Sequence, residues 1–171
     1  MDTVFENKIT LTKEVFYESI KALFGKPFRI LAILWSIGLI IIALFELCLG
    51  NFIYFIINIL LVIFILFYEN ILFKFYANKR LKQKTLLNNG DLMQETIGFS
   101  ERIQVTSSNK SESFFNYAQI TRIYETKHLL ILRISRTLNV NLDKNNFTIG
   151  NIEEFEKFIS FKCPSARFIH R

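Results

Sequence analysis

The chain contains few of the residues that most often build a chemical site. It has 2 cysteines, 2 histidines and 6 glycines in 171 residues. Neither His128 nor His170 has a cysteine, aspartate or glutamate at a spacing typical of metal ligands. The scattered glycines form no phosphate-binding loop, and no serine has a histidine and an aspartate that the sequence would pair with it. We therefore expect a protein without catalysis and without a cofactor.

A strong excess of one charge is also missing from the second half of the chain. Residues 91–171 hold eleven Lys and Arg against nine Asp and Glu, whereas residues 1–90 hold ten against six. A nucleic-acid-binding protein concentrates positive charge on a face of its folded domain. This balance excludes nucleic acid as the expected partner.

Charge is almost absent from two long apolar runs. The run from Ile30 to Leu49 contains a single charged residue, and the run from Phe52 to Tyr68 contains none. About 20 helical residues, each rising ~1.5 Å, cross a hydrocarbon core of ~30 Å. Only Gly50 and Asn51, a turn-forming pair, separate the runs. The sequence therefore predicts a transmembrane α-helical hairpin.

Basic residues flank this hairpin on one side only. The turn has no Lys or Arg, and the residues expected to anchor and orient the hairpin are Lys26, Arg29, Lys74, Lys79, Arg80, Lys82 and Lys84. Cytoplasmic flanks of membrane helices carry such an excess, and the inner leaflet attracts it. We predict a multi-pass protein of the inner (cytoplasmic) membrane, with the lipid bilayer as a partner and both termini cytoplasmic. Cys48 and Cys163 would then face opposite sides and could not pair.

We divide the chain into three parts. Residues 1–27 are expected to form a cytoplasmic N-terminal strand and amphipathic helix, residues 28–90 the hairpin with a basic juxtamembrane stalk, and residues 91–171 a cytoplasmic domain. The apolar alternation near the N-terminus suits a short strand at the edge of a sheet.

The segment after this strand has apolar residues at helical spacing, and Thr12 suits its N-cap. Two placements of the helix are open, because an amphipathic helix can lie on the inner leaflet or pack on the cytoplasmic domain. Gly25 and Pro27 are expected to end it.

Residues 92–150 change to a period of two, with turns roughly every ten residues. Asn151 and Glu154 form a capping pair ahead of an apolar helical face that Pro164 ends. The fold class we predict is α+β: the transmembrane helical hairpin plus a small antiparallel β-barrel or sheet, capped by a C-terminal helix.

Five features occur in a particular order along the chain: Thr10 to Tyr17, the hairpin, Gly98 to Glu101, Tyr117 to Thr126, and Asn146-Phe147 before the last helix. This order resembles the YcxB-like family of bacterial membrane proteins. The resemblance implies a membrane-tethered C-terminal domain similar to a pleckstrin-homology (PH) fold. It implies no catalytic residues.

Three polar residues within the apolar segments are candidates for intramembrane contacts: Glu46, Asn58 and Glu69. Polar groups in a bilayer are costly and often functional, although hydrogen bonding to a backbone or to a second copy is a simpler role for Asn58. An oligomeric transporter, channel or pore built on these residues is the alternative function.

Lys127, Arg133 and Arg136 flank the turns of one predicted β-hairpin. They form either a dispersed solvated face or a weak site for a lipid head group. The function we favour is a membrane-tethered PH-like module that binds a protein partner, a second copy of itself or a lipid head group.

Overall fold

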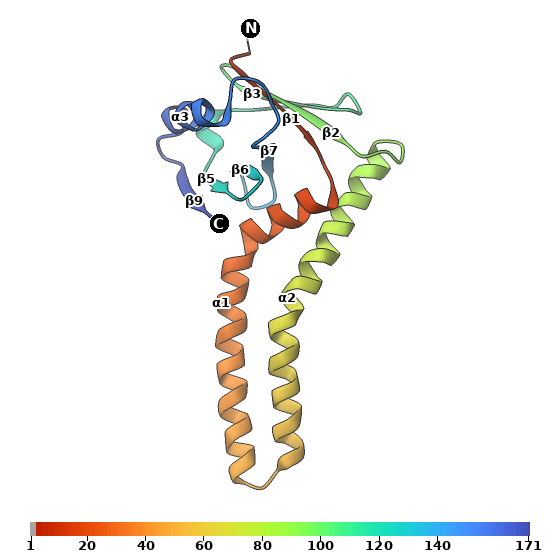
Figure 1. Cartoon of the computed structure of the whole chain (residues 1–171), viewed down its shortest axis with the longest axis vertical. Helices are drawn as coiled ribbons and strands as arrows, with labels where there is room; N and C mark the ends of the chain where they lie inside the picture. The colour runs from red at the N-terminus through yellow and green to blue at the C-terminus, as the bar shows by residue number, and fades with distance from the viewer. Residues whose placement is uncertain (1–2) are drawn as a thin grey trace.

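Two long antiparallel helices dominate the shape of the computed structural model, which describes residues 3–171 (Figure 1). Helix α1 covers Lys13–Cys48 and helix α2 covers Phe52–Leu87, with 36 residues each. Gly50, at φ +78°, lies in the turn between them. Both helices are long and apolar enough to cross a membrane. The predicted pair of long apolar helices is confirmed.

The predicted end of the first helix at Gly25 and Pro27 is wrong. Helix α1 continues through Pro27, and its first turns, in red, run obliquely to the long orange part (Figure 1). A proline lacks the N–H for one helical hydrogen bond and its ring displaces a preceding carbonyl, so it bends a helix that packing holds together. The predicted N-cap is confirmed, because the Thr12 hydroxyl accepts a hydrogen bond from the Val15 N–H at 3.3 Å.

A five-stranded antiparallel sheet lies beyond the basic end of the helices. Its strands follow one another in the order β4-β3-β2-β1-β8. They are β1 (Phe5–Thr10), β2 (Gln94–Phe99), β3 (Ile103–Ser107), β4 (Glu112–Phe115) and β8 (Phe147–Ile149).

A second sheet of four strands has the order β7-β6-β5-β9. Its strands are β5 (Arg122–Glu125), β6 (Leu129–Arg133), β7 (Asn139–Asp143) and β9 (Arg167–His170). A single 3-10 turn, η1 (Tyr117–Gln119), precedes β5. The pair β5 and β9 is parallel, whereas the other pairs are antiparallel, as the sequence predicted.

The edge position predicted for the N-terminal strand is wrong. Strand β1 pairs with β2 on one side and with β8 on the other. The long hairpin is therefore an insertion between two neighbouring strands of one sheet. The N-terminal strand belongs with the strands of residues 91–171, because an unpaired strand would leave its backbone groups unsatisfied.

Helix α3 (Ile152–Lys162) covers the first sheet. The Asn151 side chain accepts a hydrogen bond from the Glu154 N–H at 2.9 Å, which confirms the predicted cap. Phe155 is fully buried, and its ring centroid lies 4.6 Å from that of Phe99 and 5.5 Å from that of Phe5. The predicted α+β organisation with a C-terminal capping helix is confirmed.

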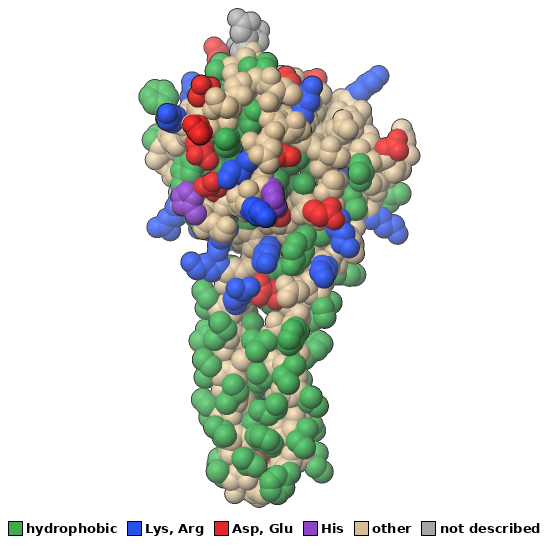
Figure 2. All heavy atoms as spheres, viewed as in Figure 1, with side chains coloured by type: hydrophobic (Ala, Val, Ile, Leu, Met, Phe, Trp, Pro, Cys, Tyr) green, Lys and Arg blue, Asp and Glu red, His purple; other side chains and the backbone are tan. Residues whose placement is uncertain are grey.

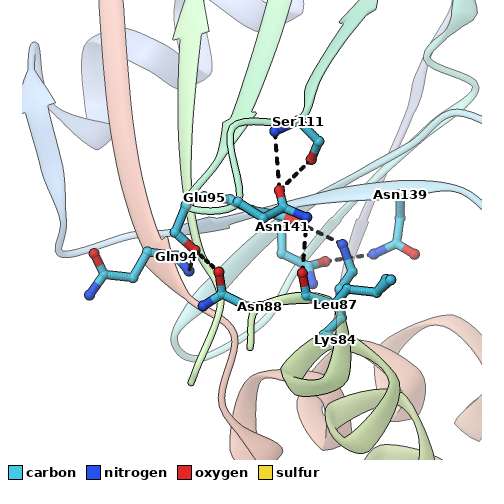
Figure 3. A network of polar contacts seen from close by, with 10 residues as sticks. Lys84, Leu87, Asn88, Gln94, Glu95, Ser111, Asn139 and Asn141 are labelled. Atoms are coloured by element: carbon cyan, nitrogen blue, oxygen red, sulfur yellow. Dashed lines mark hydrogen bonds and ion pairs between the residues drawn. The ribbon is translucent and has the colours of Figure 1, made fainter. Parts of the chain in front are cut away.

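Polar contacts fix the upper end of α2 to the first sheet (Figure 3). The Lys84 ammonium lies 3.0 Å from the Glu95 carboxylate on β2. The Asn109 amide, from the turn after β3, donates to the Leu87 carbonyl at 3.4 Å. Gly90, at φ +97°, follows the end of the helix. The helix that continues from the second apolar run is therefore joined to the β domain without a free linker.

Candidate functional site

A groove with a volume of about 970 Å³ lies where α1, α2 and the turn between β5 and β6 meet. We call it the interfacial groove. It is lined by seven basic side chains, which are Lys13, Lys21, Lys26, Arg29, Lys74, Lys127 and Arg171. Three acidic side chains also line it, which are Glu14, Glu18 and Glu69. The basic side chains thus exceed the acidic ones by four.

The first turns of helix α1 are amphipathic, with an apolar face toward the β domain and a polar face toward the groove. The face toward the β domain is buried and consists of Phe16, Ser19, Ile20 and Leu23. The opposite face lines the groove with Lys13, Tyr17 and Lys21, which are four residues apart and therefore stack along one side of a helix. Of the two placements left open by the sequence, the structure shows packing on the β domain.

Glu18 fixes the turn between β5 and β6 to α1. The His128 N–H donates to one carboxylate oxygen at 3.0 Å, and Nδ1 of the same residue lies 3.1 Å from the other. Partial burial alone would raise the pKa of the Glu18 carboxyl, but hydrogen bonds from Thr126 and His128 lower it below its usual value. The carboxylate therefore stays ionised at neutral pH and holds Lys127 at the rim of the groove.

An ion pair between the two long helices lines the groove. Nε of Arg29 on α1 lies 3.4 Å from a carboxylate oxygen of Glu69 on α2. The Glu69 side chain is buried, whereas that of Arg29 is mostly exposed. Gly25 lies next to this ion pair, and a Cβ at this position would be in ordinary van der Waals contact with the Glu69 carboxylate, at 3.5 Å. Glu69 therefore contacts Arg29, one of the basic residues that flank the apolar hairpin.

The other basic side chains of the groove have no acidic partner among residues 3–171. Only Arg29 of the seven belongs to an ion pair. Figure 2 shows Lys and Arg side chains gathered between the β domain and the apolar hairpin. Unpaired cations that share one concave surface attract an anion more strongly than the same cations dispersed.

The lower end of the groove is apolar. Ile30 and Ile33, both exposed, line it on the side of the hairpin. The surface therefore changes from basic to apolar along α1, over about three helical turns from Lys21 to Ile33.

The model of the YcxB-like protein family matches residues 99–159. Over these residues the chain is similar to the YcxB-like family. The YcxB-like region begins at the last residue of β2 and includes β3 to β8, so it contains the turn that carries Lys127. No curated protein and no solved structure matches the chain significantly.

The structure divides the predicted anchoring residues between different surroundings. Lys26, Arg29 and Lys74 line the interfacial groove. Arg80 and Lys84 line a smaller cavity of about 130 Å³ on another part of the surface. Lys79 and Lys82 are exposed and line neither cavity.

The three basic residues predicted as a ligand face within the YcxB-like region do not come together. Lys127 precedes β6 and lines the interfacial groove, whereas Arg136 follows β6 and lines the smaller cavity. Arg133 donates a hydrogen bond to the Tyr124 hydroxyl at 3.2 Å. The two turns lie at opposite ends of one strand, so a single ligand does not reach both.

The polar residues of the apolar segments make separate local contacts. Glu46 accepts a hydrogen bond from the Asn51 side chain at 2.8 Å and so closes the turn of the hairpin. The Asn58 amide donates to the Tyr54 carbonyl at 3.0 Å, within its own helix. Glu69 pairs with Arg29 at the other end of the hairpin. The three residues therefore do not form a continuous row of polar groups along the hairpin.

Sequence reasoning missed the groove because its residues come from four separate segments. Lys13 and Lys21 were not among the predicted site residues, although their spacing with Tyr17 was a usable signal. Arg171 gave no such signal. Within residues 3–171, no three His, Cys, Asp or Glu side chains gather to hold a metal ion.

Proposed function

We propose that this chain is an integral inner-membrane protein whose α1–α2 hairpin tethers a cytoplasmic PH-like domain, which acts as a binding or regulatory module without catalysis. The observation that supports it most is the exposure of apolar side chains along the hairpin. Leu34, Ile41 and Phe67 are each more than 60% exposed, and most of their apolar neighbours are also exposed. Water is a poor solvent for such a surface, whereas a bilayer is a favourable one.

The contact between the two helices also suits a membrane. The buried positions of α1 along the hairpin carry the small side chains Ala32, Ser36 and Ala43. Small residues let membrane helices approach closely, so that van der Waals contacts hold them together. The Ser36 hydroxyl donates to the Ala32 carbonyl at 2.8 Å and leaves no unsatisfied polar group in the contact.

The distribution of basic residues supports a cytoplasmic β domain. The turn around Gly50 has no Lys or Arg, whereas the opposite end of the hairpin carries the basic groove. Positive residues favour the cytoplasmic side of a membrane. Because the first turns of α1 pack on the β domain and the apolar run follows in the same helix from Ile30, the domain would lie directly on the inner leaflet.

A tether of this kind would act by holding the β domain at the membrane surface. It raises the local concentration of the domain at the membrane surface, so that a protein segment, a second copy or a lipid head group is bound as part of a two-point attachment. The exposed edge strand β4 would be available to a protein segment.

Cysteine labelling tests this topology, because the native thiols are favourably placed. Cys163 is buried, and burial raises the pKa of its thiol to about 11, so it reacts slowly. In a Cys48→Ser background, an Asn51→Cys variant places an exposed thiol in the turn of the hairpin. A Ser113→Cys variant places an exposed thiol on β4, in the β domain.

A membrane-impermeant maleimide should label the Asn51→Cys variant in intact cells. It should label the Ser113→Cys variant only after permeabilisation. Labelling of the Ser113→Cys variant in intact cells, or recovery of the chain in the soluble fraction without detergent, would contradict the proposal. An ion flux in reconstituted vesicles that Asn58→Leu abolishes would instead support a transporter or channel.

A further inference from the structure

We propose that the interfacial groove binds the phosphate head group of one anionic phospholipid, with an acyl chain lying along Ile30 and Ile33. The inference rests on the proposed insertion of the hairpin in a membrane, because only then is the lower end of the groove in contact with lipid.

The first support is the convergence of charges from three separate elements. Lys21 lies on α1, Lys74 on α2 and Lys127 in the turn between β5 and β6, and all three line the same groove. None of them has an acidic partner among residues 3–171. A phosphate group, which accepts several charge-assisted hydrogen bonds, complements such an arrangement.

The second support is that part of the arrangement is held in place. Glu18 accepts two contacts from His128 and so fixes the turn that carries Lys127. The Tyr17 hydroxyl donates to the Asn70 side chain at 3.2 Å and connects the groove face of α1 to α2. Contacts that position the walls before binding reduce the conformational entropy that the protein loses when a ligand binds.

The third support is the position and size of the groove. Its volume of about 970 Å³ suits a head group with part of its glycerol backbone. Its apolar end begins at Ile30, the first residue of the predicted membrane span. In the proposed topology, Ile30 lies at the depth in the bilayer where the lipid phosphates adjoin the acyl chains. A soluble phosphate compound would use the basic end alone, so a lipid matches the whole groove better.

Native mass spectrometry of the full chain in a neutral detergent tests the site. The protein is titrated with phosphatidylglycerol or with zwitterionic phosphatidylcholine, and glycerol 3-phosphate serves as the soluble competitor. We expect phosphatidylglycerol to be retained about tenfold more strongly than phosphatidylcholine, which is the size of effect that a few converging cations produce at a membrane surface. Glycerol 3-phosphate should displace it only weakly.

Two triple variants with the same change in charge separate the groove from general attraction. The groove variant is Lys21→Gln, Lys26→Gln, Lys127→Gln. The matched control is Lys79→Gln, Lys82→Gln, Lys157→Gln, whose positions are exposed and line neither cavity. The groove variant should lose the preference for phosphatidylglycerol, and the control should keep it.

The proposed site would be overturned if the two variants lost the preference for phosphatidylglycerol equally, or if the native chain showed no such preference. Displacement by glycerol 3-phosphate at the concentration at which the lipid binds would overturn the assignment to a lipid. The Asn51→Cys labelling, repeated in the groove variant, keeps the two proposals separate. Normal labelling of the chain with its native groove, combined with no lipid preference of that chain, defeats this inference alone, whereas failed labelling in the native background defeats the membrane topology.

Discussion

The side chain of Asn7 pairs with the backbone of Asp143 as a neighbouring strand would. Its Nδ2 donates to the Asp143 carbonyl at 2.7 Å, and the Asp143 N–H donates to its Oδ1 at 3.1 Å. Asn7 is fully buried on β1 of the first sheet, whereas Asp143 ends β7 of the second. A single amide therefore joins the two sheets, and the register between β1 and β8 shifts at the same residue.

Replacing Asn7 by alanine should lower the free energy of unfolding by about 3 kcal/mol, because two backbone groups of Asp143 lose their partners in a poorly hydrated place. The midpoint of thermal unfolding in detergent should fall by about 5 to 15 °C. Asn145→Ala, at an exposed position two residues from Asp143, is the matched control and should change stability by less than about 0.5 kcal/mol. Similar midpoints for the two variants would show that the bridge contributes little.

Local signals predicted the helical parts of the fold well. The two apolar runs, the turn at Gly50 and the caps at Thr12 and Asn151 lie where the sequence indicates, because each depends on residues that are near one another in the chain. Pro27 is the exception. Its usual effect on a helix was outweighed by packing of the residues on both sides of it.

Pairing between distant segments was not predictable in the same way. The interior position of β1 and the parallel pairing of β9 with β5 depend on contacts across most of the chain. The interfacial groove has the same origin, because Lys21 and Lys127 line it from distant parts of the chain, and Glu18 on α1 contacts the turn that carries Lys127. Charge spacing alone grouped Lys127 with Arg133 and Arg136, and of these three residues Lys127 lines the groove whereas the two arginines do not.

Gly150 should tolerate no side chain. Its φ is +80°, and a Cβ there would overlap the ring of Phe5. Gly150→Ala should therefore displace the Phe5 ring and lower the free energy of unfolding by about 2 to 4 kcal/mol, through overpacking and backbone strain. Gly38→Ala is the matched control, because a Cβ at Gly38 has no neighbour within 4 Å. An unfolding midpoint for Gly150→Ala equal to that of the control would contradict the close approach.

The free energy of unfolding should depend on pH through the Glu125 carboxyl. Its carboxylate accepts a hydrogen bond from the Lys144 ammonium at 2.6 Å and lies 2.5 Å from His170 Nδ1 on β9. The hydrogen bond from Lys144, and then that from His170, lower the pKa of Glu125 below its ordinary value of 4.5. A depressed folded-state pKa gives a stabilisation that is complete above the unfolded value and is lost as the pH falls through the folded-state value.

Glu125→Gln should therefore lower the midpoint of thermal unfolding at pH 7, and its difference from the native chain should narrow as the pH falls below 4.5. Unfolding curves of both proteins at intervals between about pH 3 and pH 7 measure this. Glu101→Gln, at an exposed position without an ion pair among residues 3–171, should show no such trend. A constant difference across the whole range would rule out the proposed role of the Glu125 carboxylate.

The ion pair between Arg29 and Glu69 should respond asymmetrically to the loss of each partner. Arg29→Gln leaves a buried carboxylate without its cation and should cost about 1 to 3 kcal/mol, whereas Glu69→Gln leaves an exposed guanidinium that water solvates and should cost less than about 1 kcal/mol. The double variant should be about as stable as Glu69→Gln alone, because neither charge is then left buried. Unfolding midpoints of the four proteins in lipid nanodiscs complete the cycle. An unfolding midpoint of Arg29→Gln equal to that of the native chain would show that this ion pair does not stabilise the contact between α1 and α2.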